Sequence, residues 1–236
     1  YASRGGKGTH AGVERFEVFA RKVSENYTRP AFVLKCDIRR FFDNIDHHIL
    51  FSLISKKIVD KNLLVLLRRI IGSFETMPGK GLPLGNVTSQ IFANMYLNEF
   101  DQFVKHTLKV TYYIRYCDDF VILGASQTFL QKLREEIASF LCHVLLLELH
   151  PNKVTIRKLQ QGTDFLGYVS LSHYLVLRTR TKQRMLKRLT ALARKIQTKD
   201  DFLILLPMIY SYLGMLSHCK GAMIRQAIEK LFKKWL

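Results

Sequence analysis

The sequence predicts an α+β fold, in which an antiparallel sheet packs on helices and a helical segment follows. Short apolar, β-rich stretches alternate with stretches of helical periodicity up to Arg178. Two β-rich stretches, YYIRY and FVILG, are separated by only a few residues and predict a hairpin, which makes the sheet antiparallel. After Arg178 only helical periodicity remains, so we place a domain boundary there.

The charge of the chain indicates its class of partner. The chain of 236 residues, 48% of them hydrophobic, is long enough for one sizeable core, or for one core with a small appended domain. Lys and Arg number 37 against 19 Asp and Glu, and the formal net charge is +18. Such an excess attracts polyanions, so nucleic acid is the expected partner, with a basic membrane-peripheral protein as the alternative. No membrane contact is expected, because apolar runs such as Leu63–Leu67 fall far short of the ~18 residues of a spanning helix.

The cysteines indicate a reducing compartment. Four are scattered along the chain without any CxxC pair: Cys36, Cys117, Cys142 and Cys219. Neither a structural zinc site nor a disulfide framework is therefore expected. We interpret them as reduced thiols of a cytoplasmic protein. No signal peptide and no initial Met are present, so the chain is expected to be part of a longer polypeptide.

The predicted strands bring acidic residues to their ends. Ala31–Ile38 is an apolar, β-rich run with one acid near its end, and Val110–Gly124 is a hairpin with acids at its tip. Further strands are predicted at Leu147–Leu149, Val154–Arg157, Phe165–Val169 and Tyr174–Leu177.

Helical spacing of apolar residues recurs in seven segments. They are Ala11–Val23, His48–Phe74, Thr88 to about Leu108, Phe129–Leu146, Lys182–Gln197, Asp200–Leu216 and Ala222–Trp235. Thr88 or Ser89 is the expected N-cap of the third segment, after the Gly- and Pro-rich loop Met77–Gly85. From Arg178 to Lys195 there are eight basic residues and no acidic one.

Three aspartates form the candidate catalytic group. Asp118 and Asp119 at the hairpin tip repel each other unless a cation neutralises them, although an Asp-rich turn without a ligand is the alternative. Asp37 would join them if its strand pairs with the hairpin; otherwise it is an edge aspartate paired with Lys35 or Arg39. Carboxylates from separate strand ends can hold two Mg²⁺ ions about 3.5–4 Å apart. Hard oxygen ligands suit Mg²⁺ or Mn²⁺ rather than zinc.

Five segments resemble successive motifs of reverse transcriptases, which are RNA-directed DNA polymerases. They are CDIRRFFDNID (Cys36–Asp46), GLPLGNVTSQIFANMYLNEFD (Gly81–Asp101), YIRYCDDFVILG (Tyr113–Gly124), LELHPNKVTI (Leu147–Ile156) and DFLGY (Asp164–Tyr168). Tyr116-Cys117-Asp118-Asp119 is a form of the family's Y-x-D-D box. The resemblance implies a right-hand polymerase fold with a remnant of the fingers at residues 1–30, the palm at 31–178 and a three-helix thumb at 179–236.

The resemblance also implies residue roles. Asp37, Asp118 and Asp119 would bind two Mg²⁺ ions, for which Mn²⁺ can substitute, and Lys153 would assist departure of pyrophosphate. Phe42 would exclude ribonucleotides by filling the space of the 2′-hydroxyl, with Phe41 as the alternative. The other implied nucleotide-binding residues are Arg4, Lys7, Ile38, Leu84, Gly85 and Gln90. The implied primer grip is Phe165, Leu166, Gly167 and Tyr168, and the implied phosphate contacts of the thumb are Lys182, Arg184, Lys187 and Arg188.

Within this family the chain most resembles the bacterial and phage enzymes of diversity-generating retroelements. The segments GTHAG, GLPLGNVTSQIFANMYLN and SYLGMLSHCKG carry this likeness. Group II intron enzymes usually have P-Q-G-G where this chain has Pro83-Leu84-Gly85-Asn86, and leucine cannot hydrogen-bond as glutamine can. An apolar residue there accompanies error-prone copying, which makes Leu84 the candidate fidelity determinant. The expected partners are an RNA template, a DNA or RNA primer, dNTPs and an accessory protein.

Other functions stay open. The nearest alternatives are a group II intron, retron, CRISPR-linked or abortive-infection reverse transcriptase. The alternative from another class is a non-catalytic, maturase-like RNA-binding protein, against which the intact trio of acids argues.

Overall fold

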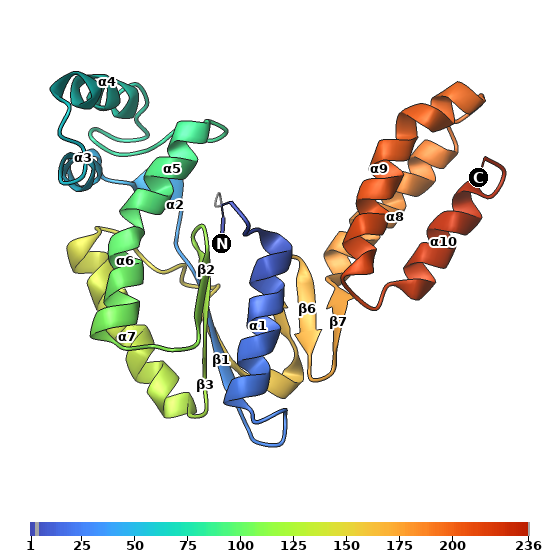
Figure 1. Ribbon diagram of the computed structural model, residues 1–236, viewed down its shortest axis with the longest axis horizontal. Coiled ribbons are helices and arrows are strands. Elements are labelled where there is room, and N and C mark those ends of the chain that lie inside the picture. The colour runs from blue at the N-terminus through green and yellow to red at the C-terminus, as the bar shows by residue number, and fades with distance from the viewer. Residues whose placement is uncertain (3–4, 236) are drawn as a thin grey trace. The chain divides into compact units, whose positions relative to one another are not determined.

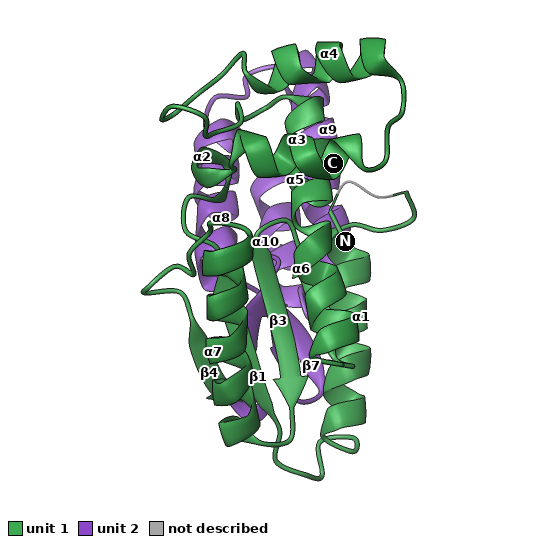
Figure 2. Cartoon of the chain, turned by 90° about the vertical axis from the view of Figure 1, so that its left-hand side faces the viewer, with its two compact units in different colours: residues 1–158 green, residues 159–236 purple. Residues whose placement is uncertain are grey.

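The computed structural model describes residues 1–2 and 5–235. The chain forms two compact units, residues 1–158 and 159–236, which are coloured separately in Figure 2. The first unit ends at residue 158, before the strands of the second unit, whereas the predicted palm-to-thumb boundary lies at Arg178. The predicted boundary separates functional parts of a polymerase, and it stays a prediction.

The first unit is built on a four-stranded antiparallel sheet, which confirms the predicted fold class. Its strand order is β2-β3-β1-β4, with β1 at Phe32–Asp37, β2 at Tyr113–Tyr116, β3 at Asp119–Gly124 and β4 at Thr155–Lys158. The central strands β1 and β3 are largely buried apolar runs, as expected for strands covered on both faces.

Helices cover both faces of this sheet. Figure 1 shows the sheet nearly edge-on, with α6 (Asn98–Gln102) and α7 (Gln127–Val144) on one side and α1 (Thr9–Val23) on the other. The main core lies on the α6–α7 side and takes alternate residues of the central strands: Leu34, Cys36, Phe120 and Ile122. Because side chains alternate between faces, Asp37 and Asp119 fall on the opposite face.

Two long predicted helices are interrupted. The helix predicted over His48–Phe74 is wrong in extent: the structure has α3 at His47–Ser55 and α4 at Lys61–Ile71, after a short α2 at Phe41–Asn44. The break falls before Asp60, whose carboxylate accepts the N–H groups of Asn62 and Leu63 and so starts a new helix.

The helix predicted to end near Leu108 is also divided. It consists of α5 (Val87–Tyr96), α6 and the π-helical η1 (Phe103–Thr107). The first of these begins at Val87 with Asn86 at the N-cap position, so the N-cap expected at Thr88 or Ser89 is wrong by two or three residues.

The second unit combines a small antiparallel sheet with three helices. The strands are β5 (Thr163–Phe165), β6 (Tyr168–Leu171) and β7 (Tyr174–Leu177), preceded by the short η2 (Leu159–Gln161). The helices are α8 (Thr179–Ala193), α9 (Lys199–Ser217) and α10 (Ala222–Phe232), close to the predicted segments. None of the helices in the described part of the chain combines the length and apolarity that crossing a bilayer needs.

Two predicted strands differ in the structure. The single strand Phe165–Val169 is wrong, because Leu166 and Gly167 have φ values of 52° and 89° and form a turn between β5 and β6. The strand predicted at Leu147–Leu149 is reduced to one bridge between Leu149 and Ile38.

Candidate active site

The pairing of β1 with β3 brings two of the three aspartates together. Asp37 is the last residue of β1 and lies directly opposite Asp119, the first residue of β3. Directly paired residues of antiparallel strands point to the same face, so both carboxylates project from the face opposite the main core. Oδ1 of Asp119 is buried. Two rigid strand ends therefore present adjacent acids.

Asp118 occupies the tip of the hairpin. Tyr116 and Asp119 are paired, so the turn consists of Cys117 and Asp118 alone. Cys117 has φ of 53°, a left-handed conformation that costs a non-glycine residue energy and needs support from its surroundings. Part of that support is a bond from the N–H of Ile38 to the carbonyl of Asp118, 3.3 Å long. The tip is thus tied to the residue after Asp37.

Arg115 fixes the base of the hairpin, and the sequence did not reveal its role. Its guanidinium, 9% exposed, donates to Asp101 Oδ2 at 2.6 Å and to Asp101 Oδ1 at 2.8 Å. It also donates to the carbonyl of Cys117 at 3.0 Å. Asp101 accepts a further bond from Tyr113 Oη at 2.7 Å. The charge-assisted, bidentate pair of Arg115 with Asp101 therefore fixes the guanidinium that binds the carbonyl of Cys117 in the turn.

The three aspartates interact electrostatically. Burial raises the pKa of Asp118 above its ordinary value, and the negative charges of Asp37 and Asp119 raise it further, while Lys153 lowers it. Like charges therefore meet at the tip, which is unfavourable without a cation.

Lys153 supplies a cation to this group. Its Nζ lies 3.1 Å from Asp37 Oδ2 and 3.2 Å from Asp37 Oδ1. The residues before it run beside the end of β1, where the N–H of His150 donates to the carbonyl of Asp37 at 2.8 Å. Backbone bonds thus place Lys153 against the acid.

The acids fit a hard divalent cation in donor type. Carboxylate oxygens are the ligands that Mg²⁺ and Mn²⁺ prefer, and the repulsion at Asp118 favours a bound cation. Among residues 1–2 and 5–235, no three His, Cys, Asp or Glu side chains yet have a geometry that could hold a metal ion. Asp37 is paired with Lys153 instead, so a metal ion at Asp37 would have to displace this lysine.

The structure distinguishes the two candidate gate residues. Phe41 is fully buried in the main core, whereas Phe42 is half-buried at its margin. The rings meet edge-on with centroids 5.2 Å apart. The carbonyl of Phe42 accepts the N–H of Leu82 at 2.8 Å, which ties it to the loop that carries Leu84. Phe42 is thus the more accessible of the two rings, and its role as a gate stays a prediction.

The other predicted nucleotide-binding residues differ in accessibility. Leu84 is 75% exposed, Gly85 has φ of 96°, and Gln90 is exposed in the first turn of α5. The side chain of Ile38 lies in the core, so only its backbone can reach a ligand. Lys7 is exposed, with Nζ 4.8 Å from the centre of the Tyr1 ring, and Arg4 lies outside the described residues.

The second unit holds the predicted primer grip and thumb contacts. Phe165 and Tyr168 are buried and anchor the β5–β6 hairpin, while Leu166 and Gly167 form its half-buried turn. Arg178 braces this turn, because its N–H donates to the carbonyl of Gly167 at 3.0 Å. The predicted thumb cations are all exposed on α8, away from its buried residues: Lys182, Arg184, Lys187 and Arg188.

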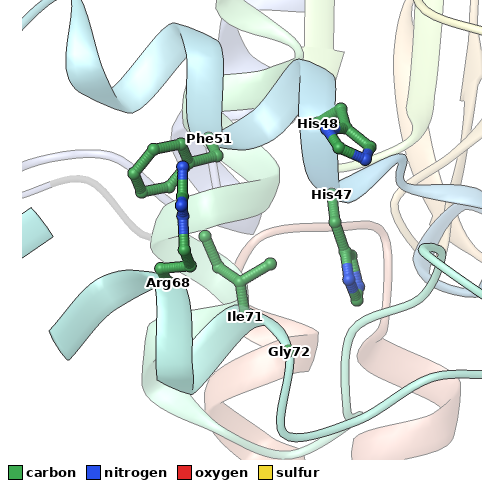
Figure 3. A pocket seen from close by; sticks show the side chains of 6 residues that line it. All are labelled: His47, His48, Phe51, Arg68, Ile71 and Gly72. Atoms are coloured by element: carbon green, nitrogen blue, oxygen red, sulfur yellow. The ribbon is translucent and has the colours of Figure 1, made fainter. Parts of the chain in front are cut away.

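A cavity of about 290 Å³ lies between α3 and α4 (Figure 3). Its walls include Phe51 and Arg68, whose guanidinium stacks 4.2 Å from the centre of the ring. The rest of its lining is His47, His48, Ile71 and Gly72, without a carboxylate.

A sheet that presents acids at the end of a hairpin, flanked by helices, is an arrangement that fits a nucleic-acid polymerase. The family model described as reverse transcriptase (RNA-dependent DNA polymerase) matches residues 2–170, and the chain belongs to this family. The protein YkfC of Escherichia coli is 26% identical over 60% of this chain and 47% of its own length. The group II intron-encoded protein LtrA of Lactococcus lactis is 26% identical over 63% of this chain and 36% of its own length.

Solved structures agree with this fold. Apo telomerase from Candida tropicalis, truncated from its C-terminal domain, matches with a TM-score of 0.58 at 15% identity, over 73% of this chain and 40% of that one. Telomerase from Candida albicans in complex with a fragment of telomeric RNA gives 0.55 at 13% identity, over 79% of this chain and 39% of that one. The chain thus spans less than half the length of these relatives.

Proposed function

We propose that this chain is the catalytic core of a reverse transcriptase that extends a primer with deoxynucleotides on an RNA template. The observation that carries the proposal is the direct pairing of Asp37 with Asp119, with Asp118 at the adjoining tip. This arrangement brings three acids to one edge of the sheet, which supports a role for them in nucleotidyl transfer.

The chain's own residues divide the work. Asp37, Asp118 and Asp119 would hold two divalent cations, whose charge would activate the 3′-hydroxyl of the primer and stabilise the leaving group of the nucleotide. Arg115 keeps the turn in place through the carbonyl of Cys117. Lys153, freed from Asp37, neutralises charge on the departing pyrophosphate.

Other residues determine the selectivity for the sugar and bind the template–primer. The half-buried ring of Phe42 excludes the 2′-hydroxyl, so deoxynucleotides are preferred. Exposed cations on α8 contact phosphates of the template–primer without reading sequence: Lys182, Arg184, Lys187 and Arg188.

We assign the enzyme to a diversity-generating retroelement, with error-prone copying determined at Leu84. The motif likeness and the exposed apolar side chain of Leu84 support this assignment. The match to LtrA supports a second candidate, an intron-encoded reverse transcriptase. The two differ in error spectrum, because the first predicts frequent misincorporation opposite template adenine.

Primer extension with the purified protein tests the proposal. We expect a DNA primer to be extended with deoxynucleotides on an RNA template, in a reaction that requires Mg²⁺. Sequencing of the products then measures errors opposite adenine and separates the two candidates. If extension is absent while the RNA still binds tightly, the protein is a non-catalytic, maturase-like RNA-binding protein instead.

A further inference from the structure

A polar cavity of about 290 Å³ opens directly beside the end of β1. It begins two residues after Asp37, and its lining is Arg39, Arg40, Asn44, Lys80, Leu146 and Glu148. Three of these side chains are cationic and one is acidic. We propose that this cavity binds inorganic pyrophosphate, the product of nucleotidyl transfer, and the proposal rests on the function proposed above.

The backbone of the two arginines is fixed. The N–H of Arg39 donates to the carbonyl of Glu148 at 2.8 Å. The side-chain amide of Asn44 donates to the carbonyls of Arg39 and Arg40, each at 3.1 Å. These bonds hold Arg40 at φ of 44°, a conformation that a non-glycine residue adopts only with such support.

Lys80 is also held by its backbone. Its N–H donates to the carbonyl of Met77, and its own carbonyl accepts the N–H of Thr76, both at 2.9 Å. Hydrogen bonds therefore fix the main chain of the residues that carry these cations, which reduces the entropy lost when they bind a ligand.

The charge of the cavity is only partly compensated. Arg39 Nη1 lies 3.3 Å from Glu148 Oε2, in a pair whose side chains are 52% and 69% exposed. Such exposed pairs are weak and exchange partners easily. In the part of the chain that the structure describes, neither Arg40 nor Lys80 forms an ion pair. Positive charge is therefore available for an anion.

The cationic side chains of the cavity favour a ligand that contains phosphate. Guanidinium groups bind phosphate oxygens in a bidentate manner, and the lysine adds a point charge. The volume corresponds to about ten waters at ~30 Å³ each, which is more room than one phosphate group needs. Two linked phosphate groups fit into this space and carry negative charge that the three cations can bind.

The position of the cavity connects it with the reaction. Residues 37–39 pair with residues 148–150 through the β-bridge between Ile38 and Leu149. A hydrogen bond from the N–H of His150 to the carbonyl of Asp37 adds to this pairing. Lys153, three residues further on, contacts Asp37. The cavity is thus lined by residues that neighbour Asp37 and Lys153 along the chain, and pyrophosphate would be released beside these two residues.

The test is calorimetric titration of inorganic pyrophosphate into the protein, with a chelator present and without primer, template or nucleotide. Arg40→Gln and Lys80→Gln should each raise the Kd about three- to tenfold, as expected for loss of a charge-assisted contact. Glu148→Gln should lower the Kd, because it removes the competing carboxylate. Lys56→Gln, at an exposed lysine after α3, is the matched control.

The outcomes separate this proposal from the polymerase proposal. Binding is measured without catalysis, so an inactive protein can still show it. Equal Kd values for Arg40→Gln, Lys80→Gln and Lys56→Gln would overturn the proposal, as would weaker binding by Glu148→Gln.

An extension assay identifies the source of the bound group. Arg40→Gln should raise the pyrophosphate concentration that half-inhibits extension and leave KM for the deoxynucleotide unchanged. A raised KM with unchanged pyrophosphate inhibition would assign the cavity to the triphosphate of the incoming nucleotide and overturn the proposal.

Discussion

Lys153 Nζ lies 3.1 Å from Asp37 Oδ2, although the two residues are separated by 116 positions in the sequence. Asp37 is only 19% exposed and Lys153 is 55% exposed, so the acid is the fixed partner and the lysine the movable one. Lys153 and a metal ion bound as proposed would therefore compete for the carboxylate of Asp37. This competition makes the two predicted roles of Lys153 and Asp37 interdependent.

Lys153→Ala should bind metal more tightly than the wild type. Loss of the exposed ion pair removes about 0.5–1 kcal/mol of competition, which corresponds to a two- to fivefold lower Kd for Mn²⁺. Electron paramagnetic resonance of free Mn²⁺ measures this without catalysis. Lys158→Ala, on β4, is the control and should leave the Kd unchanged. An unchanged or higher Kd in Lys153→Ala would contradict the competition.

Asp118→Asn should raise the thermal stability of the metal-free protein at pH 7. Burial and the nearby Asp37 and Asp119 raise the pKa of Asp118, so its charged form is disfavoured in the folded state. This penalty is complete above the folded-state pKa and vanishes below the unfolded value of ~3.9. The advantage of the variant should therefore shrink as the pH falls from 7 toward 4. Thermal melts with a chelator measure it, and a lower Tm at pH 7 would refute the assignment.

Phe42→Ala and Phe41→Ala should have different effects. Removal of the half-buried ring of Phe42 should admit ribonucleotides and cost less stability than removal of Phe41. Removal of the buried Phe41 should cost about 3–5 kcal/mol of stability. Incorporation of ribonucleotides relative to deoxynucleotides, with a denaturant melt of each variant, tests both. Unchanged sugar selectivity in Phe42→Ala would place the gate elsewhere.

Leu84→Gln should raise fidelity opposite template adenine. Its side chain is 75% exposed, so the substitution should not affect folding, and glutamine restores a hydrogen-bonding group beside the nucleotide. Sequencing of extension products measures the error rate at each template base. Leu84→Met is the matched apolar control. If Leu84→Gln and Leu84→Met make equal errors at adenine, Leu84 does not determine fidelity.

Asp101→Ala should destabilise the protein and slow catalysis. It leaves the guanidinium of Arg115 buried without its carboxylate, at a cost of about 3–5 kcal/mol. The carbonyl of Cys117 then loses a fixed donor, so kcat should fall more than primer affinity. Glu99→Ala in the same helix is the control. An undiminished kcat at a temperature where Asp101→Ala is folded would show that Arg115 does not position the turn.

Local patterns predicted much of the fold. The apolar run before Asp37 and the alternation around Asp118 gave the positions of β1 and the hairpin, because strand periodicity is a property of neighbouring residues. The division of the helix predicted over His48–Phe74 was missed, although Asp60 is a residue type that favours the N-cap position. The turn at Leu166 was missed as well, since a left-handed leucine has no local signature.

Contacts between segments that are distant along the chain could not be predicted from the sequence. The pair of Asp101 with Arg115, the contact of Lys153 with Asp37 and the cavity of Arg40 depend on how strands and loops assemble. The sequence singled out Asp37 and Lys153 separately, but only the assembled structure showed which charged residues pair with one another. The roles of the site residues themselves stay predictions for the variants above.

The most direct measurement is the rate of Mg²⁺-dependent addition of one deoxynucleotide to a primer on an RNA template, for the wild type and Asp118→Asn. The account predicts a loss of about 1,000-fold or more in the variant, because several kcal/mol of metal-dependent charge stabilisation disappear. Asp200→Asn, an exposed acid of α9, should keep the wild-type rate. A wild-type rate in Asp118→Asn would contradict the central claim that the three aspartates form the catalytic site.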